Sequence, residues 1–309
     1  MKKKVIAIVG PTAVGKTKLS IELAKRFNGE IISGDSMQVY KGFDIGTAKI
    51  KPVEMQGIEH HMIDIRDPNE EFSAADFKEN VQTYITEITS RGKLPIIVGG
   101  SGLYIQSTLY DYNFSTMKRD HDLTREMEES IASSGIMPLY NRLVKIDPEQ
   151  ANKIHPNNHR RVIRALEIYE STGKTMTEYQ KAQTIESPYE PMLLGLEMDR
   201  DLLYNRINER VDVMMAEGLL EEVRDLYEKG YHACPSMKAI GYKEFIPYFE
   251  GVQSLDETIE LLKRNSRRYA KRQFTWFKNK MDVTWYSVTP ETINEKFGII
   301  FEDLAGILK

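Results

Sequence analysis

Residues 10–17 read GPTAVGKT, which matches in full the phosphate-binding loop (P-loop) pattern G-x-x-x-x-G-K-[ST]. The apolar run at residues 5–9 predicts a strand before the loop, and apolar residues at helical spacing across 18–27 predict a helix after it. A strand, loop and helix in this order present a nest of backbone N–H groups at the positive end of the helix. We therefore expect the segment to bind a phosphate-bearing ligand.

The loop combines backbone and side-chain functions. Its glycines let the backbone curl around phosphate oxygens, Lys16 neutralises phosphate charge, and the Thr17 hydroxyl can hold Mg²⁺. On its flanks alone the loop indicates ATP or GTP, but it leaves open whether the bound compound is hydrolysed, transferred or expelled. The residues expected to bind the phosphates are Gly10, Pro11, Thr12, Ala13, Val14, Gly15, Lys16 and Thr17.

Length and composition favour a globular protein of a reducing compartment. A chain of 309 residues with 41% hydrophobic content predicts one large α/β core with a smaller second domain. The single cysteine, Cys234, excludes an intramolecular disulfide and a cysteine metal cluster. The apolar run after the initial lysines is too short for a signal peptide, and no run approaches the roughly 18 residues of a membrane span. We expect a cytoplasmic protein without a membrane segment.

Strand and helix patterns alternate along residues 1–112 and again along 190–309. This alternation predicts an α/β fold, a doubly wound parallel sheet built around the P-loop. Between residues 113 and 189 only helical patterns occur, so this segment is expected to be an all-helical insertion domain. The expected strands lie at residues 5–9, 30–33, 94–98, 192–196 and 283–288.

Polar or flexible residues follow two of these strands. Asp35 comes after the strand at 30–33, and Gly99-Gly100-Ser101-Gly102 follows the strand at 94–98. Because ligands bind beyond the carboxyl ends of parallel strands, both segments should lie beside the P-loop. Asp35 can bind Mg²⁺, act as a general base or cap the next turn. The glycine turn stands where energy-coupling NTPases usually carry a magnesium-organising acid, which favours a loop that grips a substrate's phosphates.

The net charge of −4 argues against a nucleic-acid partner, but the charge is unevenly distributed. Residues 263–280 contain eight Lys and Arg, no acid, and four aromatics, Tyr269, Phe274, Trp276 and Phe277. This segment either binds a polyanion or forms an amphipathic helix whose aromatics face the core. A second cluster, His159, Arg160, Arg161 and Arg164, places Arg160 and Arg164 on one helical face. Two such clusters favour a polyanionic partner.

Two further pairs admit more than one interpretation. Arg206 and Arg210, one turn apart in the helix expected at 202–213, either reach an anion or pair with acids at the surface, and their spacing alone favours the surface. His60 and His61 are adjacent, and no cysteine or third histidine follows at ligand spacing. A structural or polar-contact role is therefore expected for these histidines rather than zinc binding.

Longer motifs match one family. The chain resembles the bacterial tRNA dimethylallyltransferases, also called tRNA isopentenyltransferases, almost from end to end. The family commonly has Thr in its Gly-Gly-Thr-Gly segment, where this chain has Ser101, so the hydroxyl is kept. The matching segments are 10–17, 35–40 (DSMQVY), 44–49 (DIGTAK), 60–64 (HHMID), 99–104 (GGSGLY), 160–161 with 164–167, 238–244 (KAIGYKE) and 271–273 (KRQ).

The resemblance implies transfer of a dimethylallyl group from dimethylallyl diphosphate to N6 of the adenosine 3′-adjacent to the anticodon of tRNA, with release of diphosphate. Asp35 would be the general base, Lys16 and Thr17 would act on the diphosphate with Mg²⁺ as cofactor, and Arg206 would join them. The helical insertion would contact the tRNA, and a monomer is expected. The residues implied on the tRNA side are Asp35, Ser36, Met37, Gln38, Ser101, His159, Arg160, Arg161 and Arg164.

Other functions stay open from the residues alone. A small-molecule kinase would use the same loop, but the missing strand-end acid and the two basic clusters count against it. A nucleotide-regulated RNA-binding protein without chemistry would not need Asp35 beside the loop. An enzyme that prenylates free adenine nucleotides would need neither the large insertion nor the basic surface.

Overall fold

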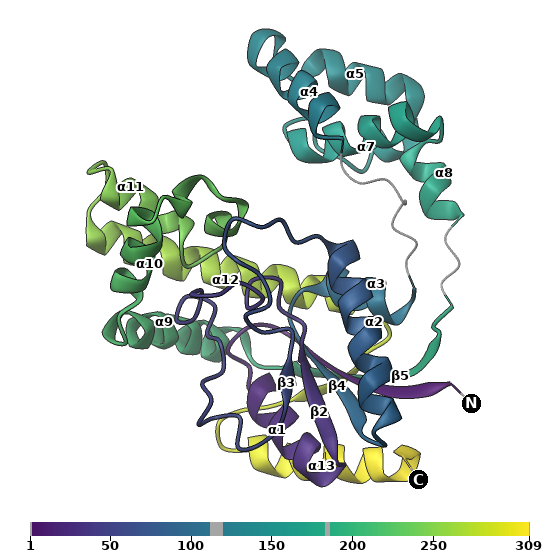
Figure 1. Ribbon diagram of the computed structural model, residues 1–309, viewed down its shortest axis with the longest axis vertical. Helices are drawn as coiled ribbons and strands as arrows, with labels where there is room; N and C mark the ends of the chain where they lie inside the picture. Colours follow the sequence, from purple (N-terminus) through teal and green to yellow (C-terminus); the bar gives the residue numbers. More distant parts are fainter. Residues whose placement is uncertain (1, 112–119, 183–185, 309) are drawn as a thin grey trace. The chain divides into compact units, whose positions relative to one another are not determined.

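The computed structural model describes residues 2–111, 120–182 and 186–308 (Figure 1). The chain divides into two compact units. We call Met1–Asp111 with Ser187–Lys309 the core unit, and Tyr112–Glu186 the helical unit. No helix in the described ranges is both long and apolar enough to span a membrane.

The core unit is built on one sheet of six parallel strands in the order β3-β2-β4-β1-β5-β6. The predicted α/β fold with a parallel sheet is confirmed. The edge strand β3 was not predicted, because two residues are too few to show a period of two. The strands are β1 Lys3–Val9, β2 Gly29–Ser33, β3 His60–His61, β4 Leu94–Gly99, β5 Tyr189–Glu197 and β6 Thr284–Ser287.

Alternate residues of β1 are buried on opposite faces of the sheet, which places helices on both sides. Val5, Ala7 and Val9 pack with helices α2 (Ala74–Ser90) and α3 (Gly102–Leu109). Ile6 and Ile8 pack instead with α1 (Lys16–Arg26) and α13 (Ile293–Leu308) (Figure 1). Because β1 is covered by helices on both faces, all of its central residues are apolar, which explains the continuous apolar run in the sequence.

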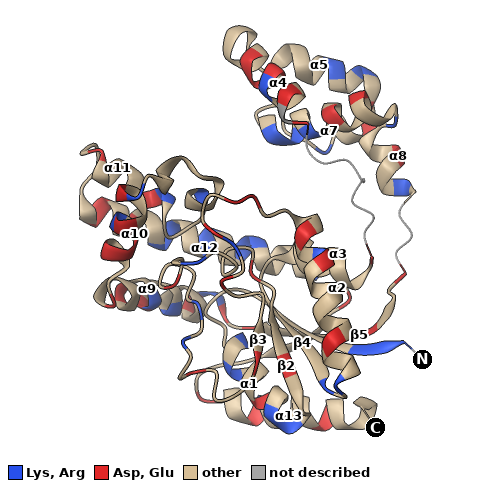
Figure 2. Ribbon diagram, viewed as in Figure 1, with Lys and Arg blue, Asp and Glu red and all other residues tan. Residues whose placement is uncertain are grey.

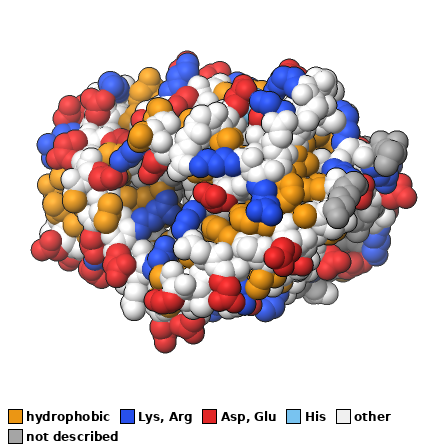
Figure 3. All heavy atoms as spheres, turned by 90° about the horizontal axis from the view of Figure 1, so that it is seen from below, with side chains coloured by type: hydrophobic (Ala, Val, Ile, Leu, Met, Phe, Trp, Pro, Cys, Tyr) orange, Lys and Arg blue, Asp and Glu red, His pale blue; other side chains and the backbone are white. Residues whose placement is uncertain are grey.

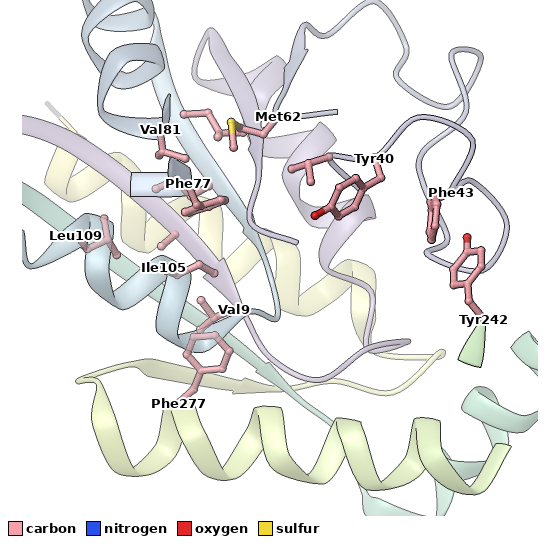
Figure 4. Packing of buried hydrophobic residues seen from close by; sticks show 14 of the residues in the cluster. Val9, Tyr40, Phe43, Met62, Phe77, Val81, Ile105, Leu109, Tyr242 and Phe277 are labelled. Atoms are coloured by element: carbon pink, nitrogen blue, oxygen red, sulfur yellow. The ribbon is translucent and has the colours of Figure 1, made fainter. Parts of the chain in front are cut away.

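The remaining elements of the core unit follow β5. The long helix α12 begins with a capping box, in which the Ser254 hydroxyl accepts from Glu257 N–H and the Glu257 carboxylate accepts from Ser254 N–H. Phe277, near the other end of α12, is fully buried against Val9 and Ile105 (Figure 4). These elements are α9 Arg200–Ala216, α10 Leu219–Glu228, η1 Tyr231–Ala233, η2 Pro235–Lys238, η3 Lys243–Phe245, α11 Ile246–Phe249 and α12 Leu255–Lys280.

The segment between β2 and β3 is irregular, and side chains from α10 and the η3 region hold it in place. The carboxylate of Glu222 accepts hydrogen bonds from the backbone N–H groups of Asp44, Ile45 and Gly46, at 3.2, 2.7 and 3.1 Å. The Tyr242 hydroxyl also donates to this carboxylate, and its ring packs on Phe43 with the ring centroids 4.4 Å apart (Figure 4). These contacts fix the loop that leads into one wall of the site described below.

The helical unit has a small core of its own. Val162, Ile163 and Leu166 of α7 are buried there with Leu143 of α5. Asp147, at the junction of two helices, accepts hydrogen bonds from the backbone N–H and the hydroxyl of Thr177, which ties the last helix to the others. The described part of this unit contains helices and no strand: α4 His121–Ser134, α5 Met137–Ile146, α6 Pro148–Ala151, α7 His159–Thr172 and α8 Met176–Lys181.

Candidate functional site

A cavity of about 490 Å³ lies at the carboxyl ends of β1, β2 and β4 in the core unit. Loops that follow these parallel strands meet at this edge, as expected for a ligand site of an open α/β sheet. The predicted site residues that line the cavity are Thr12, Ala13, Val14, Gly15, Lys16, Thr17, Asp35, Gln38 and Arg206. Gly10, Pro11, Ser36, Met37 and Ser101 adjoin it in the chain without lining it.

Two glycines of the P-loop occupy backbone conformations that side chains rarely adopt. Gly10 has φ +138°, and a Cβ there would lie 2.4 Å from the carbonyl oxygen of Leu196 on the neighbouring strand β5. Gly15 has φ +107° and precedes the first turn of α1. Both positions therefore require glycine, and the chain turns there so that the helix begins at Lys16.

The amine of Lys16 is folded back onto its own loop. Its Nζ donates to the carbonyl oxygens of Gly10 and Pro11, at 2.9 and 2.7 Å. The pKa of Lys16 is lowered to about 7, because burial and the positive charge of Arg210 lower it more than the negative charge of Asp35 raises it. The amine is thus held in place beside the cavity, and an anion that enters would restore its charge.

Asp35 faces the same cavity from the segment after β2. Its Oδ1 accepts a hydrogen bond from the backbone N–H of Met37 at 2.8 Å. Burial raises the pKa of Asp35, while the Met37 hydrogen bond and the charge of Lys16 oppose that rise. A buried carboxyl with a raised pKa is a stronger base than an exposed one, so Asp35 is suited to accept a proton.

Two arginines of α9 lie against the P-loop. The Nε of Arg206 donates to the carbonyl oxygen of Ala13 at 3.1 Å, and Nη1 of Arg210 donates to the Thr12 hydroxyl at 3.3 Å. Burial lowers the pKa of Arg210, and the negative charge of Asp35 opposes this shift. Their spacing alone had favoured pairing with surface acids, and the structure places them at the cavity instead. The acid Asp212 pairs with Lys263.

One signal in the sequence could have located these arginines. Leu203, Ile207 and Val211 form the buried stripe of α9, and each arginine precedes one of the last two by a single residue. A charged residue at the border of an apolar stripe lies between core and solvent, where its long side chain can reach a neighbouring pocket.

The remaining predicted residues of the segment after β2 are held by hydrogen bonds. The backbone N–H of Ser36 donates to the Ser101 hydroxyl at 3.2 Å. Gln38 uses both ends of its amide, since Oε1 accepts from the Ser33 hydroxyl at 2.8 Å and Nε2 donates to the carbonyl oxygen of Thr47 at 3.2 Å. Gln38 therefore lines the cavity in a fixed orientation, and Ser36 is held against the glycine turn.

Part of the cavity is apolar, and sequence reasoning missed it. The side chains that line this part come from β2, from the end of β4 and from the irregular segment around β3, and in that irregular segment no periodic pattern marks buried positions. A short hydrocarbon could occupy this recess while an attached phosphate group lies on the loop. The apolar lining residues are Ile31, Ala48, Ile50, Ile63 and Val98.

Helix α12 has one face in the core and the cavity and another in solvent. Tyr269 and Gln273 line the cavity, while Ala270 and Phe277 are buried. One face of residues 263–280 thus packs in the core, as the interpretation of this segment as an amphipathic helix predicts. The exposed face carries basic residues, visible as blue segments along α12 in Figure 2. These exposed residues are Arg264, Arg268, Lys271, Arg272, Lys278 and Lys280.

The other predicted basic cluster lies in the helical unit and does not line the cavity. His159, Arg160 and Arg161 are exposed at the start of α7. Arg164 pairs with the buried carboxylate of Glu167 at 2.9 Å, so part of its charge is used within the unit. On the face drawn in Figure 3, acidic and basic side chains are interspersed, in keeping with a small net charge spread over the surface.

Two groups of residues were compared as metal ligands. The Thr17 hydroxyl and the Asp35 carboxylate line one cavity, and such oxygen ligands suit a hard cation such as Mg²⁺. Glu30, Glu59 and His61 also lie close enough to share an ion. Glu30, however, already pairs with His61, Arg91 and Lys93, at 2.7, 2.7 and 2.9 Å. We interpret the second group as an ion-pair cluster, in keeping with the polar role expected for the histidines.

Comparison with known proteins gives consistent matches. A family model described as IPP transferase matches residues 38–280. A curated relative from Oceanobacillus iheyensis, named tRNA dimethylallyltransferase, is 61% identical over 309 residues, covering 100% of this chain and 99% of that protein. A relative of the same name from Bacillus subtilis is 56% identical over 309 residues, covering 100% and 98%.

Two solved structures are similar over most of the chain. The crystal structure of a tRNA isopentenylpyrophosphate transferase from Bacillus halodurans has a TM-score of 0.76 and 52% identity, covering 99% of this chain and 96% of that one. A eukaryotic dimethylallyltransferase acting on tRNA has a TM-score of 0.81 and 39% identity, covering 94% and 75%.

The state of Lys16 gives a prediction about anion binding. At about pH 8 most of the free protein should carry a neutral Lys16, because the pKa is about 7, and a bound anion should recharge it. The wild-type protein should therefore take up more protons than the K16R variant on binding inorganic diphosphate, since arginine stays protonated. Calorimetry in two buffers of different ionisation enthalpy measures the uptake. Equal uptake by the two proteins would contradict this assignment of Lys16.

Proposed function

We propose that this chain, which belongs to the IPP transferase family, transfers a dimethylallyl group from dimethylallyl diphosphate to N6 of the adenosine 3′-adjacent to the anticodon of tRNA, in the cytoplasm. One observation carries the proposal: a half-buried acid, Asp35, shares a single cavity with the P-loop, Lys16 and Arg206. This arrangement suits a reaction in which diphosphate leaves and a proton must be accepted nearby.

The P-loop side of the cavity serves the leaving group. Breaking the allylic C–O bond leaves the electron pair on diphosphate, whose negative charge grows as the bond stretches. Loop N–H groups, the Lys16 amine and the Arg206 guanidinium stabilise this charge most strongly in a desolvated site. The apolar recess beside Ile50 and Ile63 accommodates the five-carbon tail. The diphosphate of the donor is thus assigned to the P-loop, and its hydrocarbon tail is assigned to the apolar side chains.

The Asp35 side serves the acceptor. The exocyclic amine of adenine is a poor nucleophile, because its lone pair is delocalised into the ring. A hydrogen bond from this amine to the Asp35 carboxylate would orient it towards the allylic carbon. As the N–C bond forms, the amine loses a proton and Asp35 accepts it, and the raised pKa of Asp35 favours that transfer. In the complete step, the allylic C–O bond and one N–H bond of the amine break and one N–C bond forms. Diphosphate departs with the electron pair of the C–O bond, and Asp35 holds the proton.

A divalent cation fits this site through the Thr17 hydroxyl, which lines the cavity beside the rest of the P-loop. When bound, such an ion, Mg²⁺ in our proposal, supplies positive charge that neutralises diphosphate oxygens.

Recognition of tRNA requires phosphate contacts and access to one base. An unpaired base in an anticodon loop costs little to extrude, so its edge can reach a cavity of this kind. We assign phosphate contacts to the exposed His159, Arg160 and Arg161 of the helical unit, with a smaller part for Arg164 because Glu167 already pairs with it. Ser36, Met37, Gln38 and Ser101 are proposed to border the base.

The general-base role of Asp35 predicts a specific loss. The D35N variant keeps the shape of the side chain but cannot accept the proton, so its turnover should fall by roughly 10²-fold or more. Its affinity for an anticodon stem-loop should stay within a few fold of wild type. In the wild-type protein, kcat/KM should decline on the acid side at a higher pH than for an ordinary aspartate, because burial raises the pKa of Asp35. Near-normal turnover of D35N would exclude the role.

The helical unit offers a separate test of RNA binding. If Arg160 and Arg161 contact phosphates, the R160A/R161A variant should bind the stem-loop more weakly, and the slope of log K against log salt should flatten by roughly 0.7 to 0.9 for each phosphate that is no longer neutralised. R125A is the matched control, because Arg125 is exposed on the same unit and pairs with Asp122. If R160A/R161A has the same salt slope as the wild type, Arg160 and Arg161 do not contact RNA phosphates and are ordinary solvated surface residues.

A further inference from the structure

Gln273 of α12 lies between the P-loop and the glycine turn. Its Oε1 accepts a hydrogen bond from the backbone N–H of Thr12 at 2.9 Å, and the residue is only 5% exposed. Its Nε2 lies directly against Gly100, where a Cβ would be 1.8 Å away. One buried amide therefore touches both sides of the cavity, and the glycine turn leaves the room for it.

Tyr269, one turn earlier on the same helix, extends this contact. Its side chain lies beside those of Gln273 and Ser101. The Ser101 hydroxyl accepts in turn from the backbone N–H of Ser36 at 3.2 Å. A series of neighbouring side chains, hydrogen-bonded at both ends, thus connects Thr12 on the phosphate side with Ser36 on the side of Asp35.

We propose that Gln273 and Tyr269 are positioning residues, which fix the P-loop relative to the glycine turn and the segment after β2. This inference rests on the proposed function, because it assigns the two sides of the cavity to diphosphate and to the acceptor base. Gln273 holds the first part of the loop, whose N–H nest must keep its shape to bind diphosphate. Without that support the loop must be ordered when the ligand binds, which weakens binding.

A matched pair of variants separates this role from a general contribution to stability. Gln106 is also a buried glutamine, 8% exposed, and its Nε2 donates to the carbonyl oxygen of Lys280 at the end of α12. Gln106 therefore holds the end of α12 and has no hydrogen bond to the P-loop among those that the structure describes. Q273A should bind inorganic diphosphate roughly tenfold more weakly than wild type. Q106A should keep wild-type affinity, while thermal unfolding shows a comparable loss of stability in both.

The hydroxyl of Tyr269 has a distinct readout. Y269F keeps the ring and the contact between Gln273 and Thr12, but it removes the connection to Ser101 and Ser36. Its affinity for inorganic diphosphate should stay within about twofold of wild type, while kcat falls and the donor KM does not rise. A rise in donor KM without a fall in kcat would overturn the role assigned to Tyr269.

Gly100 provides an independent way to displace the same amide. G100A should push the Gln273 amide away at little cost to the fold, because Gly100 has no positive φ and the amide is the end of a flexible side chain. Its diphosphate affinity should fall as in Q273A, and G100A/Q273A should be no weaker than either single variant.

Calorimetric titration with inorganic diphosphate and Mg²⁺ measures the affinity of the wild-type protein and of the five variants Q273A, Q106A, Y269F, G100A and G100A/Q273A. Additive losses in G100A/Q273A, or wild-type affinity in Q273A, would overturn the positioning role while leaving the proposed function intact. A wild-type protein that does not bind diphosphate would instead contradict the proposed function itself.

Discussion

Three charged groups, Lys16, Arg210 and Asp35, are half-buried around one small cavity, and the chemistry of the site depends on their partial removal from water. Desolvation lowers the pKa of Lys16 and of Arg210 and raises that of Asp35. The charged form of each group is most stable when an opposite charge is near, so an anion that enters the cavity favours the charged forms of Lys16 and Arg210. An entering diphosphate satisfies the cations. In the proposed reaction, Asp35 is then the base of raised pKa that accepts the proton of the acceptor amine.

The backbone brings these groups together through close approaches that only small residues permit. Gly10 passes against the carbonyl oxygen of Leu196, and Gly99 passes against the backbone of Gly34. Side chains at these positions would separate the strand ends, and the P-loop and Asp35 would no longer share a cavity. The parallel sheet thus places the residues, and the glycines set how tightly the loops meet above it.

Much of this arrangement could be predicted because it is encoded locally. The P-loop pattern, the apolar strands and the position of Asp35 are read directly from neighbouring residues. The strand β3 could not be predicted, since its two residues pair with β2 through tertiary contacts alone. The position of Arg210 was also wrongly predicted from its spacing, because a cation on a helix usually faces solvent. Only the packing of α9 on the P-loop brings Arg210 to the cavity.

Helix α12 illustrates how one sequence pattern can carry two roles. Its buried face holds Gln273 against the P-loop, and its exposed face carries Arg268 and Lys271. A helical period places these residues on different faces, so the two interpretations of the basic segment are compatible. Composition alone could not separate them, and the contact of Gln273 with Thr12 depends on packing between segments far apart in the chain.

The most direct test of the central claim is the product of the reaction. The protein is incubated with dimethylallyl diphosphate, Mg²⁺ and an anticodon stem-loop RNA, and the RNA nucleosides are then analysed by mass spectrometry. The account predicts one adenosine, immediately 3′ of the anticodon, carrying an added dimethylallyl group on N6, with an equal amount of diphosphate released. Unmodified RNA, or prenylation of free AMP in preference to the stem-loop, would contradict it.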